Sequence, residues 1–189
     1  SPANPSGTMI GAQELEDIVA LCAKRKLWLV SDEIYHGITY GDPAQTALAF
    51  SPDVIVINSF SKYFSMTGWR IGWMVVPEAL ARPIERLAQN LYISPPTISQ
   101  VASLAALDAK AELDGHVRSY AANRSRLLAA LKEAGFATVA PADGAFYLYA
   151  DISPFGLDAG TFTKNLLEQV RSAWTIASSS AARDSRFSW

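Results

Sequence analysis

The sequence predicts an α/β protein in which a mostly parallel, helix-covered sheet is followed by a smaller α+β unit. Three observations support this fold class. A helical pattern near the start is followed by short apolar runs. These runs are apolar throughout rather than alternating, as in strands that helices cover on both faces. After residue 95, helical patterns predominate. The 189 residues suffice for one large domain or two small ones.

The first predicted element is a helix over 12–26. Its apolar residues recur at helical spacing, its acidic residues come early and its basic residues late, which suits the helix dipole. The apolar runs at 27–30, 54–57 and 71–76 predict three buried strands. Residues 1–76 therefore form the predicted α/β unit.

Prolines divide the rest of the chain. Pro77 and the pair at 95–96 bracket a predicted helix over 78–91, so residues 77–95 are interpreted as a helix and linker between two units. Pro96 can open a further helix, which we expect to run to about residue 110.

Residues 96–170 are predicted to form the smaller α+β unit. After Gly115 the expected elements are a helix over 117–131, strands over 137–140 and 145–151, and a helix over 161–170. Residues 171–189 contain six serines but neither glycine nor proline, and we interpret them as an atypical tail.

The composition excludes several classes of function. Half of the residues are hydrophobic and the net charge is −2, so the chain is not a disordered one and lacks the basic field that a nucleic-acid partner requires. No apolar run approaches the length that crosses a bilayer, and the start lacks a signal-peptide pattern, so we expect a cytoplasmic protein without a membrane partner. Two histidines and one cysteine predict no metal site.

The densest group of polar residues follows the strand at 54–57. Lys62 lies there, and a lysine that is partly desolvated or close to other cations can become a nucleophile toward carbonyls. Arg70 comes eight residues later and could both lower the pKa of that lysine and bind an anion. Taken alone, this pattern also fits two solvated cations.

A second polar group, Asp32 and Tyr35, follows the strand at 27–30. Ligands of open α/β sheets lie beyond the carboxyl ends of the strands, so we expect Asp32, Tyr35 and Lys62 at one edge. A carboxylate there can keep a heteroaromatic nitrogen protonated, although a capping role for Asp32 is the alternative. Glu33 should point away from Asp32 on an extended backbone. A lysine, a carboxylate and an anion clamp together are what pyridoxal phosphate chemistry requires.

Four segments, in this order, resemble the signature segments of the class I/II aminotransferases, the fold-type I pyridoxal-phosphate enzymes of the aspartate aminotransferase superfamily. They are SPANPSG at 1–7, SDEIY at 31–35, SFSK at 59–62 and MTGWRIG at 66–72. The resemblance continues through GAFY at 144–147 and reaches about residue 170. It implies a C-terminal portion only, with residues 1–76 supplying the last strands of a three-layer α/β/α large domain that binds the cofactor.

The resemblance implies pyridoxal 5'-phosphate as cofactor and transfer of an amino group between an amino acid and a 2-oxo acid. Lys62 would form the Schiff base and move the proton between the substrate and the cofactor. The implied cofactor contacts are Asp32 to the pyridine nitrogen, Tyr35 and Asn4 to the ring oxygen, and Ser59 and Arg70 to the phosphate.

Two residues are implied to bind the substrate carboxylate: Asn4, and Arg186 within an RFS segment of the tail. Enzymes of this family are about twice as long as the chain, so we expect its apolar faces to lack neighbours and the chain alone to be inactive. A homodimer is expected for the full-length parent. Two alternatives stay open, because fold does not determine the reaction: a lyase or decarboxylase of the same fold, or a non-catalytic ligand-sensing module.

Overall fold

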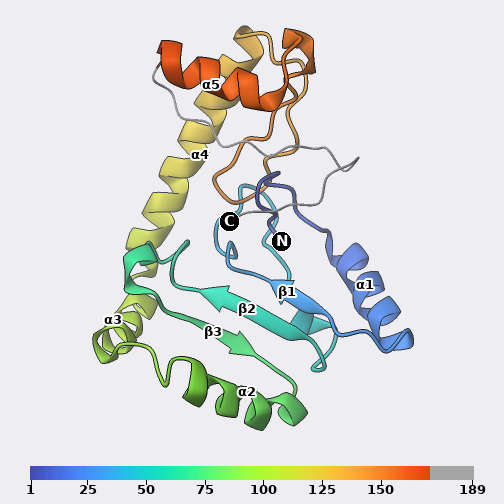
Figure 1. The fold of residues 1–189 in the computed structure, drawn as a ribbon, viewed down its shortest axis with the longest axis vertical. Coiled ribbons are helices and arrows are strands. Elements are labelled where there is room, and N and C mark those ends of the chain that lie inside the picture. The colour runs from blue at the N-terminus through green and yellow to red at the C-terminus, as the bar shows by residue number, and fades with distance from the viewer. Residues whose placement is uncertain (171–189) are drawn as a thin grey trace.

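The computed structural model describes residues 1–170. Figure 1 shows a small sheet in the lower half with α1 beside it, α2 and α3 below it, and the long α4 rising to the top, where α5 crosses it. The helices are α1 (Ala12–Lys24), α2 (Glu78–Leu91), α3 (Thr97–Leu107), α4 (Lys110–Glu133) and α5 (Ala159–Val170). The strands are β1 (Val30–Asp32), β2 (Ile55–Ser59) and β3 (Gly72–Val75).

The sheet has the order β1-β2-β3. β1 and β2 are parallel, with Val30 opposite Ile55 and Asp32 opposite Ile57. This pair confirms the expected parallel arrangement, whereas β3 runs antiparallel to β2. The link between β2 and β3 contains only a short 3-10 turn, Thr67–Trp69. A parallel return needs a crossover that passes over a face of the sheet, usually as a helix, and this link forms none, so β3 returns antiparallel.

The prediction of a buried strand over 27–30 is wrong in both position and burial. β1 begins only at Val30, and the side chains of Leu27 and Trp28 are 58% and 63% exposed. Leu29 packs against the core, but its neighbours point the other way, and β1 is an edge strand of the described sheet. An apolar run therefore does not imply burial on both faces here.

The two strands predicted over 137–140 and 145–151 do not form as regular strands. The structure has one isolated antiparallel bridge between Val139 and Ala150, and backbone hydrogen bonds extend the pairing by only one residue on each side. Pro141 has no N–H to donate, and Ala145 has a φ of 56°. Both features interrupt a continuous ladder.

Helix α4 begins at Lys110, seven residues before the predicted start at 117, so Gly115 lies inside the helix. A glycine within a helix costs only about 1 kcal/mol relative to alanine, which the 24-residue helix tolerates. Helix α2 has the predicted bounds, and α5 begins two residues earlier than the predicted 161.

The core has two parts. Leu15 and Val19 of α1 pack on Val54 and Val56, so α1 covers one face of the sheet. Phe60, Met66 and Ile71 form a second cluster under the turn that contains Lys62. No helix within residues 1–170 is both long and apolar enough to cross a membrane.

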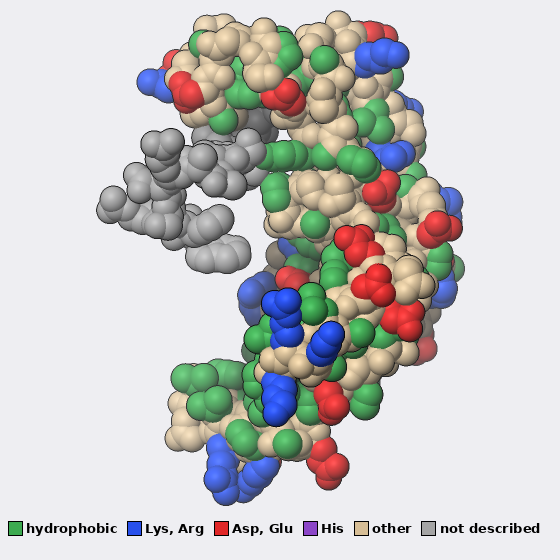
Figure 2. Space-filling view, turned by 90° about the vertical axis from the view of Figure 1, so that its right-hand side faces the viewer, with side chains coloured by type: hydrophobic (Ala, Val, Ile, Leu, Met, Phe, Trp, Pro, Cys, Tyr) green, Lys and Arg blue, Asp and Glu red, His purple; other side chains and the backbone are tan. Residues whose placement is uncertain are grey.

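Much of the lower part of the molecule exposes apolar side chains, and Figure 2 shows hydrophobic side chains among charged ones there. β3 is exposed along its whole length within the described residues, so the prediction of a buried strand over 71–76 is wrong in burial, and α2 buries no residue. The exposed large hydrophobic side chains of α2, α3 and the loop between them are Leu87, Leu91, Tyr92, Ile93, Ile98, Val101, Leu104 and Leu107. Within the described residues, these faces have no neighbour.

Candidate active site

The carboxyl ends of β1 and β2 bring the candidate residues to one edge of the sheet. Asp32 ends β1 and Ser59 ends β2, and because the two strands are parallel, the segments that follow them leave the sheet on the same side. Lys62 Nζ lies 5.6 Å from the centroid of the Tyr35 ring. Tyr35 and Lys62 are therefore adjacent, and Asp32 lies at the same edge, close enough for its charge to act on Tyr35.

Tyr35 is the centre of this group and is buried, with 4% of its surface exposed. Its hydroxyl lies 2.5 Å from that of Tyr147, which is 112 residues away in the chain. Burial, and after it the hydrogen bond with Tyr147, raises the pKa of Tyr35 well above its ordinary value of 10.0, while a hydrogen bond with the Asn4 side chain acts in the opposite direction. Tyr35 is thus a neutral phenol at every physiological pH.

Lys62 has aromatic neighbours. Its Nζ lies 5.6 Å from the ring centroid of Tyr35 and 5.8 Å from that of Phe146, distances at which a ring face attracts a cation. The Lys62 carbonyl oxygen accepts a hydrogen bond from Ser65 N at 3.0 Å, which closes the turn. The amine is therefore directed toward the Tyr35 and Phe146 rings.

Helix α4 holds this turn through the residue after Lys62. Tyr63 Oη donates to Asp114 Oδ1 at 2.6 Å. Burial and the contact with Asp114 raise the pKa of Tyr63 to about 12. Hydrogen bonds from Lys110 and then Tyr63 lower the pKa of the Asp114 carboxyl. The turn and the helix are thus joined by a phenol–carboxylate bond.

Ser59 and Arg70 lie on either side of the β2–β3 turn. Ser59 Oγ is 2.9 Å from Ser61 Oγ and accepts from Ser61 N at 3.0 Å. Arg70 is exposed, has a left-handed backbone with a φ of 51°, and donates from Nη1 to Thr67 O at 3.0 Å. Since Ser59 is opposite Gly72 in the ladder, both residues belong to the same end of the hairpin.

The two neighbouring carboxylates have different environments. Asp32 is exposed, and its Oδ1 accepts from Ile34 N at 3.2 Å, so it also caps the turn as the alternative interpretation proposed. Glu33 is buried, and its Oε1 accepts from Ala47 N at 2.9 Å and Thr46 Oγ1 at 3.1 Å. Glu33 therefore points away from Asp32, as predicted, and holds the following loop.

Sequence reasoning missed two contributors to this site, Tyr147 and the pair Tyr63–Asp114. Tyr147 belongs to the GAFY segment that the resemblance covers, and Tyr63 directly follows Lys62. No local sequence pattern indicates that Tyr147 contacts Tyr35 or that Tyr63 contacts Asp114. Arg186 lies outside the described residues. Within residues 1–170, no group of three or more His, Cys, Asp or Glu side chains could hold a metal ion.

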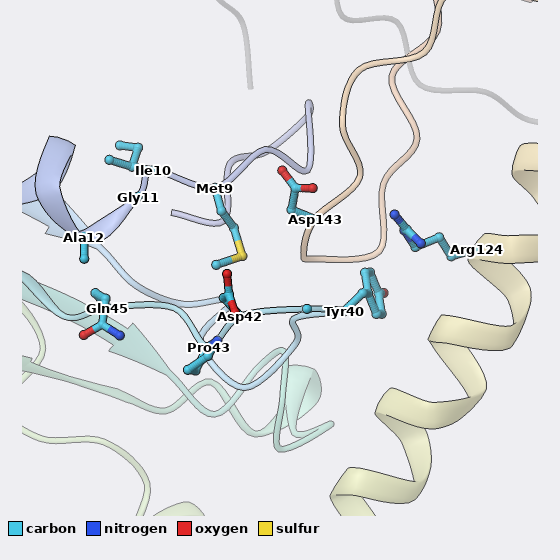
Figure 3. A pocket seen from close by; sticks show the side chains of 11 residues that line it. Met9, Ile10, Gly11, Ala12, Tyr40, Asp42, Pro43, Gln45, Arg124 and Asp143 are labelled. Atoms are coloured by element: carbon cyan, nitrogen blue, oxygen red, sulfur yellow. The ribbon is translucent and has the colours of Figure 1, made fainter.

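A cavity of about 610 Å³ lies elsewhere, between the start of α1, the loop after β1 and α4. In Figure 3 Arg124 enters from α4, Asp143 from the loop that precedes Gly144, and Tyr40 and Asp42 from the loop after β1. None of the predicted site residues lines this cavity. The candidate site at the sheet edge is thus separate from this cavity.

The donor set at the sheet edge fits pyridoxal phosphate. The Lys62 amine suits the cofactor aldehyde, and the Tyr35 phenol beside it suits the ring oxygen. The carboxylate that ends β1 suits the pyridine nitrogen, and the serine and arginine at the hairpin suit the phosphate. The residues at this edge are therefore chemically suited to the class of pyridoxal-phosphate-dependent enzymes.

Within that class, the chain belongs to the family of class I and II aminotransferases, whose family model matches residues 1–186. It is 48% identical over 171 residues to valine–pyruvate aminotransferase of Mycobacterium tuberculosis, covering 88% of this chain and 44% of that protein. It is 34% identical over 175 residues to an arginine–pyruvate transaminase of Pseudomonas aeruginosa, covering 89% of this chain and 44% of that protein.

Solved structures agree in fold. An aminotransferase from Mycobacterium tuberculosis matches with a TM-score of 0.88 and 47% identity, over 92% of this chain and 46% of that one. A Thermus thermophilus aspartate aminotransferase variant matches with a TM-score of 0.84 and 32% identity, over 89% and 45% respectively. The chain spans about half the length of the curated relatives it matches. Class I aminotransferases of the aspartate aminotransferase type use pyridoxal phosphate.

Proposed function

We propose that the protein of which this chain forms a part transfers an amino group between an amino acid and a 2-oxo acid with pyridoxal phosphate as cofactor. The observation that carries this proposal is the position of Lys62 Nζ, 5.6 Å from the centroid of the Tyr35 ring at the edge where Asp32 and Ser59 end their strands. When bound, the cofactor supplies an electron sink that stabilises negative charge at the substrate α-carbon.

Each side chain has a proposed task. Asp32 holds a proton on the pyridine nitrogen, because a carboxylate at that position makes the charged form favourable. Tyr35 donates its hydroxyl proton to the ring oxygen, and Asn4, which hydrogen-bonds Tyr35, contacts the same oxygen and the substrate carboxylate. Lys62 binds the cofactor aldehyde through Nζ and moves the α-proton.

Ser59 and Arg70 are proposed to hold the phosphate group. A serine hydroxyl donates one hydrogen bond to a phosphate oxygen, and a guanidinium can bind two oxygens at once. Arg70 is exposed and donates to Thr67 O through Nη1, which leaves its other N–H groups to face an anion. Arg186 is proposed to bind the substrate carboxylate.

The substrate class follows from relatives that carry substrate names. Two of them, the valine–pyruvate and arginine–pyruvate enzymes, are named for transfer to pyruvate. We therefore propose pyruvate as an acceptor. We further propose that the exposed faces of β3, α2 and α3 are covered in the active protein by the remaining half of the family fold and by the second subunit of a homodimer.

The test is formation of alanine from pyruvate with a panel of amino acid donors, including valine and arginine. The protein is assayed at the length of its relatives and as the 189-residue chain. We expect alanine and the matching 2-oxo acid in equal amounts from the longer protein. Release of carbon dioxide or ammonia in place of a 2-oxo acid would instead identify a decarboxylase or lyase.

A further inference from the structure

The segment that carries Tyr147 is tied to the site edge at several points. Gly144 N donates to Gly7 O at 2.9 Å, Ala145 N donates to Ile38 O at 2.9 Å, and Gly144 forms a β-bridge with Thr39. A Cβ at Gly144 would lie 2.4 Å from the Pro2 side chain, so the backbone approach there is close. These contacts fix the position from which Tyr147 reaches Tyr35.

The two phenols meet in a defined geometry. Their hydroxyl oxygens are 2.5 Å apart, and the rings are in an edge-to-face contact with centroids 5.6 Å apart. Tyr35 also faces Asn4 through a hydrogen bond, Lys62 through its ring, and the charge of Asp32. Each phenol has one proton, so in this pair one hydroxyl donates and the other accepts.

The direction of that bond matters once an anionic ring oxygen lies beside Tyr35. Tyr35 then gives its proton to the anion, and its oxygen can only accept from Tyr147. A hydroxyl that accepts one hydrogen bond becomes a stronger donor in the next, because the bonds of a chain polarise one another. Tyr147, Tyr35 and the ring oxygen would therefore form a chain of two hydrogen bonds that ends on the cofactor.

We propose that Tyr147 is a positioning residue for the cofactor site, whose hydroxyl donates to Tyr35 and directs the Tyr35 proton toward the ring oxygen of pyridoxal phosphate. This inference rests on the proposed function. It assigns to the GAFY segment a task beyond packing: the segment places a second phenol behind the first, so that displacement of residues 144–147 weakens the hold on the cofactor.

The test compares Tyr147→Phe with Tyr35→Phe and with Tyr120→Phe. Tyr120 is a matched control, because its ring contacts Phe146 in the same aromatic group with centroids 5.7 Å apart. The readout is the pH midpoint at which the visible absorbance of the bound cofactor changes. A weaker donor leaves more negative charge on the ring oxygen, which holds the proton of the neighbouring Lys62 nitrogen more tightly, so the midpoint rises.

We expect Tyr147→Phe to raise this midpoint by roughly a fifth of the rise caused by Tyr35→Phe, since cooperative strengthening is about 10–30% per bond. It should also weaken cofactor binding in equilibrium dialysis, whereas Tyr120→Phe changes neither. A midpoint in Tyr147→Phe equal to that of the unaltered protein, or an equal shift in Tyr120→Phe, overturns the inference.

A second measurement separates this inference from the proposed function. If the unaltered protein, at the length of its relatives, forms no cofactor band, the proposed function fails, and the Tyr35–Tyr147 bond is then judged without cofactor. In the cofactor-free chain, the melting-temperature losses of Tyr35→Phe and Tyr147→Phe should not add in the double variant, because either change breaks the same bond. Additive losses overturn the inference.

Discussion

Replacing Gly37 by alanine should destabilise the turn that connects Tyr35 to the rest of the site. Gly37 has a φ of +90° and is the third residue of a turn in which Ile38 N donates to Tyr35 O at 3.0 Å. A Cβ built on Gly37 would lie 2.6 Å from Cδ2 of Tyr63 and 2.8 Å from its Cγ. Alanine at this position is therefore strained by its backbone and by a ring that helix α4 holds in place.

The size of the effect has two parts. A left-handed conformation costs a residue with a Cβ about 1–2 kcal/mol. Overpacking against a fixed ring costs about 1–3 kcal/mol more. The Tyr63 ring cannot easily move, because its hydroxyl donates to Asp114 at 2.6 Å. We expect Gly37→Ala to lower the free energy of unfolding by about 2–5 kcal/mol.

Urea unfolding followed by circular dichroism measures this loss, and Gly135→Ala is the matched control. Gly135 has a φ of +92°, but a Cβ there would meet nothing within 4 Å. Gly135→Ala should therefore show the backbone cost alone, about 1–2 kcal/mol. If the two variants lose equal stability, the contact between Gly37 and the Tyr63 ring does not constrain the Lys62 turn and the reasoning fails.

Four further outcomes are expected. Asp32→Asn should lower transamination by roughly a hundredfold in a steady-state assay. The melting temperature should change little, because the exposed side chain can still accept from Ile34 N. A large fall in melting temperature together with the loss of activity would refute the proposed role of Asp32. Glu33→Ala should cost about 1–3 kcal/mol in urea unfolding, since Ala47 N and Thr46 Oγ1 lose their acceptor Oε1. The folded-state pKa of Tyr63 is raised from 10.0 to about 12. Its contribution to the free energy of unfolding is therefore complete below pH 10 and is lost as the pH rises to about 12. In Tyr63→Phe the free energy of unfolding should fall less between pH 10 and pH 12. The chain alone should self-associate in analytical ultracentrifugation, and Leu104→Lys, at a side chain 68% exposed, should reduce association.

The position of the site residues at one edge of the sheet could be predicted from the sequence, because it depends on which residues end the strands. Asp32 and Ser59 end strands that are neighbours and parallel, so their position at one edge follows from the order of elements. The helices were also predictable, since their apolar spacing extends over several turns. The roles assigned to these residues stay predictions, as does the domain boundary within 77–95.

Other features depend on contacts that no local pattern contains. The direction of β3 depends on the link after β2, which forms no crossover helix, and periodicity carries no information on strand direction. The exposure of Trp28 follows from the position of β1 at the sheet edge rather than from its own sequence. The Tyr35–Tyr147 hydrogen bond joins residues 112 positions apart, so it can be identified only from the folded structure.

The central claim, that Lys62 binds the cofactor, is tested most directly by borohydride reduction of the protein in the presence of pyridoxal phosphate, followed by peptide mass spectrometry. Reduction makes the bond between lysine and cofactor permanent, so the labelled residue can be read among the six lysines of the chain. We predict a single label on the peptide that contains Lys62, lost in Lys62→Ala and retained in Lys24→Ala. A label distributed over the exposed lysines, or one that persists in Lys62→Ala, would contradict the account.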